Sequence, residues 1–110
     1  MTTVDLSNAT SLEKIGIRAF FKCSQLENID LSKAVNLKEI GDNAFNSSGV
    51  ENVTFPQNSQ LTEIGSGVFT LCNNLKNIDI PETVTKIGGS AFERTGLTSI
   101  KIPASVTNIE

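Results

Sequence analysis

The sequence contains no His, Trp or Tyr, and all six of its aromatic residues are Phe. Without His, it lacks the commonest general base and the commonest neutral metal ligand in proteins. The abundant Ser and Thr hydroxyls therefore have no obvious group to activate them for nucleophilic catalysis. Without Trp and Tyr, most aromatic anchors of a typical binding pocket are missing as well. The composition argues against an enzyme and against a cofactor site.

Concentrated positive charge and long apolar runs are also absent. The formal net charge is −3 and no window is dominated by Lys or Arg, which argues against nucleic-acid binding. No apolar run approaches the roughly 20 residues that cross a bilayer, so membrane insertion is not expected. Residues 1–5 lack the charged and apolar regions of a secretory signal, which leaves the location of a parent protein open. With 110 residues, 38% of them apolar, residues 1–110 fit a single folded domain.

One phrase of sequence recurs along the whole chain. Five Ile residues occupy equivalent positions at spacings of 25, 24, 23 and 22 residues: Ile15, Ile40, Ile64, Ile87 and Ile109. The first four are followed by Gly, then by Ala or Val, and then by Phe20, Phe45, Phe69 and Phe92 in turn. Self-similarity at such a period is typical of stacked repeat proteins. Each repeat has too few apolar residues to fold alone, so the repeats are expected to share one core.

Each repeat contains two extended segments. In "LENIDL", "VENVTF", "LKNIDI" and "LTSIKI" the last four residues alternate polar and apolar, which predicts a strand with one buried face. A shorter extended piece leads to the recurring Gly, where a positive φ or a close approach of neighbouring coils is expected. Segments such as "RAF" and "SAF" fit a single tight helical turn that places Phe inside. A long helix over residues 12–26 is disfavoured, because a Gly costs about 1 kcal/mol there relative to Ala.

Repeat length varies at two points only. Between the alternating strand and the next apolar residue there are six steps in "LSKAVNL" and "FPQNSQL", but four in "IPETV" and "IPASV". The interval from Phe to the next Leu or Val also varies, between five and six steps. Insertions confined to such points are expected at surface turns of a stack.

The phrase Leu-x-x-Ile-x-Ile-Pro-x-x-Val-Thr-x-Ile-Gly-x-x-Ala-Phe-x-x-Cys-x-x-Leu resembles the BspA-type, or treponemal-type, leucine-rich repeat. Residues 75–97 and 97–109 are most similar to it, whereas "DLSNATSL" and "DLSKAVNL" lack the Pro and lengthen the turn. The resemblance implies an α/β repeat solenoid with little helix, a right-handed coil of about 4.5 repeats of 22–25 residues with a parallel β-sheet on one face. It also implies a non-catalytic bacterial protein, secreted or on the cell surface, that acts as an adhesin for host extracellular proteins.

Cys23 and Cys72 occupy equivalent positions two coils apart. Adjacent parallel strands lie about 4.8 Å apart, so the two residues should be separated by about 10 Å. A disulfide needs Cβ atoms about 4 Å apart. Both residues are therefore expected to be reduced, buried and small hydrophobes, and without His or a third Cys no metal site is expected.

Polar side chains should point away from the core on the sheet face. They form a candidate binding face, which consists of Asn28, Asp30, Asn52, Thr54, Asn77, Asp79, Ser99 and Lys101. Asp5 would precede them, about 5 Å from Asp30, a spacing at which carboxylate pairs perform acid/base chemistry or hold Ca²⁺. Thr54 interrupts the acidic row, so a solvated polar face is the preferred interpretation. The Asn series is either an amide ladder that supports the stack, which we favour, or part of a binding face.

Three classes of function remain in view. The leading interpretation is a non-catalytic protein–protein interaction module with a protein partner, of which a host extracellular protein is the expected type. The alternative is a structural spacer, a scaffold segment or an engineered repeat with no ligand of its own. A carbohydrate-active coil would need clustered carboxylates beside a basic group, and Asp5, Asp30 and Lys101 are too scattered for that.

The two ends of the chain lack the polar capping units that solenoids normally carry. Met1 takes the place of a strand residue, and the chain stops at Glu110, before the next expected Gly-x-x-Ala-Phe. The chain is therefore expected to be a segment of a longer array, and its uncapped ends to favour self-association.

Overall fold

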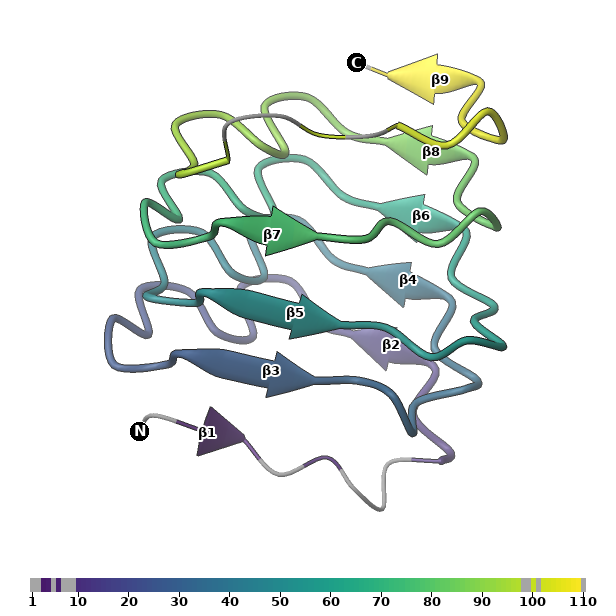
Figure 1. Ribbon diagram of the computed structural model, residues 1–110, viewed down its shortest axis with the longest axis horizontal. Helices are drawn as coiled ribbons and strands as arrows, with labels where there is room; N and C mark the ends of the chain where they lie inside the picture. Colours follow the sequence, from purple (N-terminus) through teal and green to yellow (C-terminus); the bar gives the residue numbers. More distant parts are fainter. Residues whose placement is uncertain (1–2, 5, 7–9, 98–99, 101, 110) are drawn as a thin grey trace.

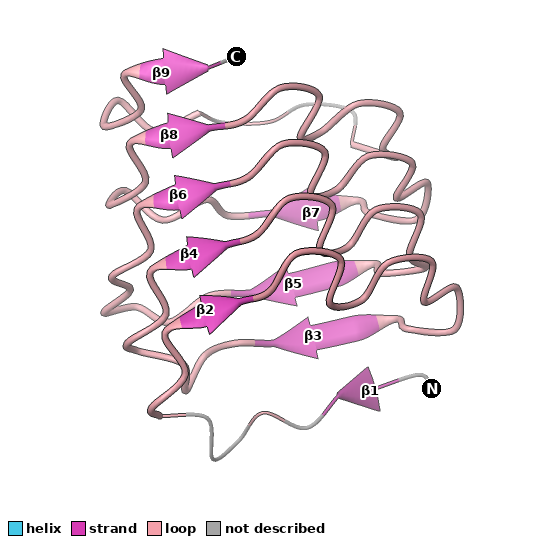
Figure 2. Cartoon of the chain, turned by 180° about the vertical axis from the view of Figure 1, so that it is seen from behind, coloured by secondary structure: helices cyan, strands magenta, loops and turns pink. Residues whose placement is uncertain are grey.

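The described residues form two parallel β-sheets, one of four and one of five short strands, and the coils stack into a right-handed solenoid (Figure 1). The computed structural model describes residues 3–4, 6, 10–97, 100 and 102–109. Asp5, Ser99 and Lys101 of the sequence predictions lie outside the described residues. Figure 2 shows the second sheet from behind, with its strands stacked in the same order as the coils.

Each strand pairs in parallel with the equivalent strand of the next coil. The first sheet, sheet A, has the order β1 (Thr3–Val4), β3 (Asn28–Asp30), β5 (Asn52–Thr54) and β7 (Asn77–Ile78). The second, sheet B, has the order β2 (Lys14–Ile15), β4 (Glu39–Ile40), β6 (Glu63–Ile64), β8 (Lys86–Ile87) and β9 (Asn108–Ile109). The register matches repeat to repeat, with Ile29 opposite Val53 and Ile40 opposite Ile64.

Sheet B and the turns that follow it differ from the sequence prediction. One sheet was expected, but the short extended pieces before each Gly also pair into a sheet. The predicted single helical turns are absent from the described residues, which contain no helix. Instead, each coil has consecutive tight turns, such as Ala19 N–H to Gly16 C=O (3.2 Å) and Cys23 N–H to Phe20 C=O (3.1 Å).

Two residues per coil have a left-handed backbone, which explains why no helix forms. They are Arg18 and Lys22, Asn43 and Ser47, Gly67 and Leu71, and Ser90 and Arg94. In the coils before the last two residues of this set, their amides donate hydrogen bonds to the next coil. For example, Arg18 N–H donates to Asp42 C=O (3.0 Å) and Lys22 N–H to Asn46 C=O (2.9 Å). A helix would direct these amides along its own axis instead, and the bond to the neighbouring coil would be lost.

The core is one continuous cluster between the two sheets, as the repeat pattern predicted. Its centre is a ladder of four Phe rings, with centroids 5.2, 5.5 and 5.5 Å apart and interplanar angles of 8°, 4° and 17°. Phe45 and Phe69 are fully buried, whereas Phe20 and Phe92 are half-buried. Separations of this size are within the favourable range for aromatic pairs.

Close approach, the second of the two predicted reasons, explains the Gly after β4, β6 and β8. None of these residues has a positive φ. A Cβ atom on Gly41 would lie 2.7 Å from the Ile17 amide nitrogen, and one on Gly88 would overlap the Ser66 amide. Gly16 differs, because nothing lies within 4 Å of a Cβ placed there. Neighbouring coils thus touch through their backbones at this position.

Both cysteines are free thiols, as predicted, but only one is buried. Cys72 is fully buried, and its thiol donates to the Phe45 carbonyl (3.0 Å). Burial raises the pKa of the Cys72 thiol, although its hydrogen bond to Ser48 acts in the opposite direction. Cys23 was expected to be buried and is half-buried, because it lies in the outermost layer of turns among the described residues.

The close contact at Gly41 predicts a large difference between two Gly→Ala substitutions. Gly41→Ala should lower the free energy of unfolding by about 1–3 kcal/mol, because the added methyl group has to displace backbone atoms. Gly16→Ala, its matched control, should be neutral or stabilising by up to about 1 kcal/mol. Urea unfolding followed by circular dichroism measures both. Equal effects of the two substitutions would show that backbone contact does not set this position.

Burial also predicts unequal reactivity of the two thiols. In the folded protein Cys23 should react with Ellman's reagent, whereas Cys72 should react only after addition of denaturant, because it is buried and remains protonated. Release of thionitrobenzoate measures the number of reactive thiols over time. In the Cys23→Ser variant the fast phase should disappear, and a remaining fast phase would contradict the buried position of Cys72.

Candidate functional site

The candidate binding face predicted from the sequence lies on the outer surface of sheet A. We call its described members the polar row: Asn28, Asp30, Asn52, Thr54, Asn77 and Asp79. All six side chains are exposed, whereas Ile29 and Val53, which alternate with them, are buried. The parallel register sets Asp30 opposite Thr54. The structure therefore brings the six residues together on one flat surface.

Two members of the polar row also have a structural role. Asn52 donates from Nδ2 to Oδ1 of Asn28 (3.1 Å), which forms one step of an amide ladder between coils. Asp30 accepts a hydrogen bond from the Ser32 amide (2.9 Å) and so holds the turn that follows β3. Hydrogen bonds from the Ser32 side chain and backbone lower the pKa of Asp30, and Lys33 adds to this effect. The side chains of Thr54 and Asp79 form no hydrogen bond with other described residues.

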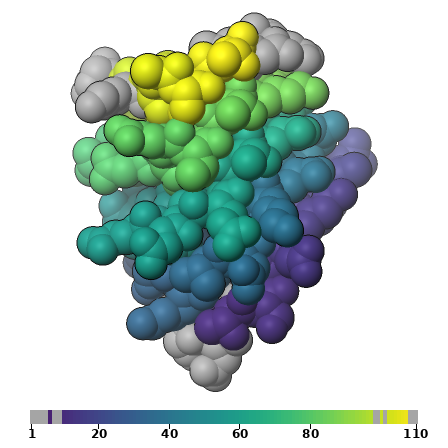
Figure 3. Space-filling model, turned by 90° about the vertical axis from the view of Figure 1, so that its right-hand side faces the viewer, coloured from purple at the N-terminus to yellow at the C-terminus, as the bar shows by residue number. Residues whose placement is uncertain are grey.

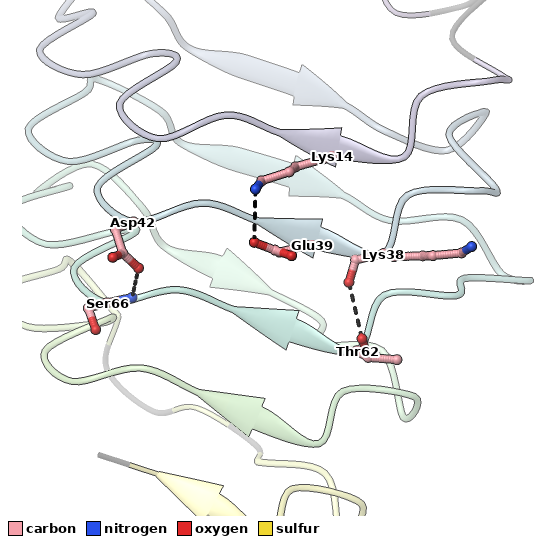
Figure 4. A network of polar contacts seen from close by, with 6 residues as sticks. All are labelled: Lys14, Lys38, Glu39, Asp42, Thr62 and Ser66. Carbon is pink, nitrogen blue, oxygen red and sulfur yellow. Dashed lines mark hydrogen bonds and ion pairs between the residues drawn. The ribbon is translucent and has the colours of Figure 1, made fainter.

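A row of charged residues on sheet B was not anticipated. Lys14, Glu39, Glu63 and Lys86 occupy equivalent positions in four successive strands. Lys14 forms an ion pair with Glu39 (3.4 Å), and the backbone carbonyl of Lys38 accepts a hydrogen bond from the Thr62 hydroxyl (3.3 Å; Figure 4). The signal was present in the sequence, because "EKI", "KEI", "TEI" and "TKI" all place a charge before Ile.

Apolar side chains are exposed in the turns opposite the sheet A to sheet B edge. Ile17 is 65% exposed, and Phe21 is 37% exposed. The Phe21 ring lies between two cations, with Arg18 Cζ 5.6 Å and Lys22 Nζ 5.3 Å from its centroid. Contacts at this distance are weakly favourable when exposed to solvent. Leu71, 40% exposed, occupies the position of Lys22 two coils later.

Hollows follow the other edge, where the chain passes from sheet A to sheet B. One hollow of about 580 Å³ lies between the turns after β5 and β7 and includes Thr54 and Asp79 of the polar row. Another, of about 450 Å³, lies between the turns after β3 and β5. Figure 3 shows this edge of the molecule. These hollows were not predicted from the sequence, because their shape depends on the relative paths of two turns.

The described surface offers groups that suit recognition of another molecule. In the described part of the chain, no group of three or more Cys, Asp or Glu side chains is close enough to hold a metal ion. The same residues include no helix that could cross a bilayer. Hydrogen-bonding amides, carboxylates and hydroxyls on a rigid sheet are suited to contacts with another molecule.

Comparison with known proteins identifies the repeat. The family model for the BspA type leucine rich repeat region matches residues 1–110 in six copies, more than the about 4.5 repeats counted from the Ile-Gly positions. No curated protein matches the chain.

Three solved structures share the fold. A leucine-rich repeat protein from Bacteroides ovatus ATCC 8483 is 33% identical, with a TM-score of 0.79, over 88% of this chain and 24% of that one. The leucine-rich repeat protein of T. pallidum is 26% identical, with a TM-score of 0.80, over 88% and 44%. A leucine rich cell surface protein from Faecalibacterium prausnitzii A2-165 is 24% identical, with a TM-score of 0.53, over 88% and 38%.

The chain spans less than half the length of each of these structures. Their likeness, together with the two parallel sheets and the family match over residues 1–110, determines the type of repeat. Leucine-rich repeats are generally protein-interaction modules without catalytic activity. This chain belongs to the BspA-type leucine-rich repeat family.

Proposed function

We propose that the chain is a non-catalytic recognition module that binds another protein through the polar row of sheet A. The observation that carries this proposal is the exposure of six polar side chains over an apolar layer in which Ile29 and Val53 are buried and Ile78 is half-buried. Paired strands fix these side chains at a spacing of about 4.8 Å between coils. Because the surface is already ordered, binding costs little conformational entropy in the scaffold.

The partner that fits this proposal best is an extracellular host protein, and the parent protein is then secreted or displayed on the cell surface. The membership in the BspA-type family supports this assignment. A long, flat and polar face also suits a large protein surface better than a small molecule, which prefers an enclosed apolar pocket. Thr54 and Asp79 are well placed to bind, because the side chain of neither residue forms a hydrogen bond within the described stack.

A spacer or scaffold role is the second candidate. It is favoured by the Asn52 to Asn28 hydrogen bond, which uses both side chains to connect adjacent coils. Under this alternative, the polar row serves solubility and stacking, and a separate domain of the parent protein binds the partner. The two candidates differ in whether the face contributes to adhesion.

A triple substitution tests the proposal. Asp30→Ala, Thr54→Ala and Asp79→Ala together should weaken binding to immobilised extracellular-matrix proteins at least about tenfold, because loss of a few central contacts typically removes 1–2 kcal/mol or more. Biolayer interferometry at physiological salt measures the change. A control with Glu13→Ala, Asn74→Ala and Glu93→Ala removes two carboxylates and one other polar side chain from exposed positions elsewhere. Unchanged binding by the first variant would favour the spacer role.

A further inference from the structure

The 580 Å³ hollow exists because two neighbouring turns differ in length. We call it the corner hollow; it is lined by residues 53–57, 59 and 79–83. The turn after β7 is short and closed by the Val84 amide, which donates to the Pro81 carbonyl (3.1 Å). The turn over residues 55–61 is two residues longer and contains no backbone-to-backbone hydrogen bond of its own. Because the two turns follow different paths, they leave space between them where equivalent strands would stack.

The surface of the corner hollow combines an apolar wall with an acidic rim. Phe55 and Pro81 are half-buried, and Pro56 and Ile80 are buried beneath them. Asp79 and Glu82 are exposed at the rim, and neither forms an ion pair with another described residue. Lys and Arg are absent from the described residues that line it. Among the described lining residues, the rim is therefore acidic and carries no cation.

We propose that the corner hollow binds an extended, positively charged segment of a protein partner and takes up one of its Lys or Arg side chains. The aliphatic stem of such a side chain can cover the Phe55 and Pro81 surface while its cationic head stays near the rim. Asp79 and Glu82 then supply two carboxylates to the head, and the half-buried Phe55 ring adds an aromatic face. The inference rests on the proposed function, because it names the chemistry of the partner beside the polar row.

The occupant follows from charge complementarity. A negatively charged segment would meet two carboxylates at the rim, and like charges at an interface oppose association. A neutral apolar side chain would contact the apolar wall but leave the rim carboxylates partly desolvated and unpaired. A cation satisfies both parts of the surface. The 170 Å³ hollow that shares Asp79, Ile80 and Glu82 continues the same acidic edge toward Pro103.

Titration of the isotope-labelled chain with a capped tripeptide tests this proposal. Acetyl-Leu-Arg-Leu-amide should shift the amide resonances of the residues other than Pro in 54–59 and 79–83, and acetyl-Leu-Gln-Leu-amide should bind several-fold more weakly. The double variant Asp79→Asn and Glu82→Gln should weaken binding of the Arg peptide roughly threefold to tenfold, since exposed ion pairs are individually weak. Raising the salt from 50 to 500 mM should reduce the same binding, because exposed charges are screened.

A matched control separates local from overall charge. The variant Glu51→Gln and Glu93→Gln removes the same two negative charges from exposed positions outside the corner hollow, and it should bind like the parent. Equal affinity for the Arg and Gln peptides, shifts scattered over other surfaces, no shift at millimolar peptide, or equal loss in both double variants would each overturn the proposal.

Single substitutions distinguish this inference from the proposed function. Glu82 belongs to the corner hollow and not to the polar row, whereas Asp30 belongs only to the polar row. If matrix-protein binding is sensitive to Asp30→Ala but Glu82→Gln changes neither that binding nor peptide binding, the inference fails alone. If the peptide binds at the corner hollow and no polar-row variant affects matrix-protein binding, the proposed function of the polar row is wrong. The proposal that the corner hollow binds a cationic side chain is then still supported.

Discussion

The lateral hydrogen bond from one coil to the next is the interaction on which the structure depends. Both sheets pair each coil with its neighbour, and the turns that contain the Phe ladder do the same: Phe45 N–H donates to Val68 C=O (3.0 Å) and Phe69 N–H to Ala91 C=O (2.8 Å). Buried backbone groups have to be paired, and a coil without helix cannot pair them internally. Each coil is therefore completed by its neighbours, and stability accumulates from nearest-neighbour interfaces.

Lateral pairing also decides which side chains suit each position, because every side chain stacks on its equivalent in the next coil. Phe rings gain from this repetition, as their parallel ladder shows. Thr hydroxyls gain as well: Thr85 donates to the Thr62 carbonyl (3.3 Å), and Thr83 donates to that of Leu61 (2.6 Å). Stacking of like charges is unfavourable, and Glu39 lies opposite Glu63 in the ladder. The ion pair from Lys14 to Glu39 offsets part of that repulsion.

Sheet A could be predicted because its strands are long enough to show alternation. Ile29 and Val53 are buried between exposed neighbours, as the period of two requires. The pairing of sheet B was missed, because two residues such as Lys14–Ile15 carry no period. Little helix was correctly expected, but the single helical turns predicted before each Phe are tight turns instead. Arg18 and Lys22 adopt a left-handed backbone there, which their residue types do not indicate. In that case lateral bonding between coils overrides local preference.

Exposure of the polar row followed from the same alternation, but its division into free and engaged members did not. Asp30 is held by Ser32 and Asn28 by Asn52, contacts that depend on the exact placement of a turn and of the adjacent coil. The corner hollow could not be predicted either, although its cause, a turn of six steps beside one of four, is visible in the sequence. The variation in turn length indicated which residues lie at the surface, but it did not indicate the shape of that surface.

Stacking makes successive coils alike, so specificity has to arise where they differ. Along the polar row the change from Asp30 to Thr54 is such a difference, and the change in turn length after β5 and β7 is another. The two meet at one place, because Thr54 and Asp79 belong both to the row and to the corner hollow. A partner that contacts this junction touches at least two coils and reads a feature that simple repetition cannot supply. Recognition by a repeat protein of this kind therefore depends on the irregularities that a uniform stack permits at its surface turns.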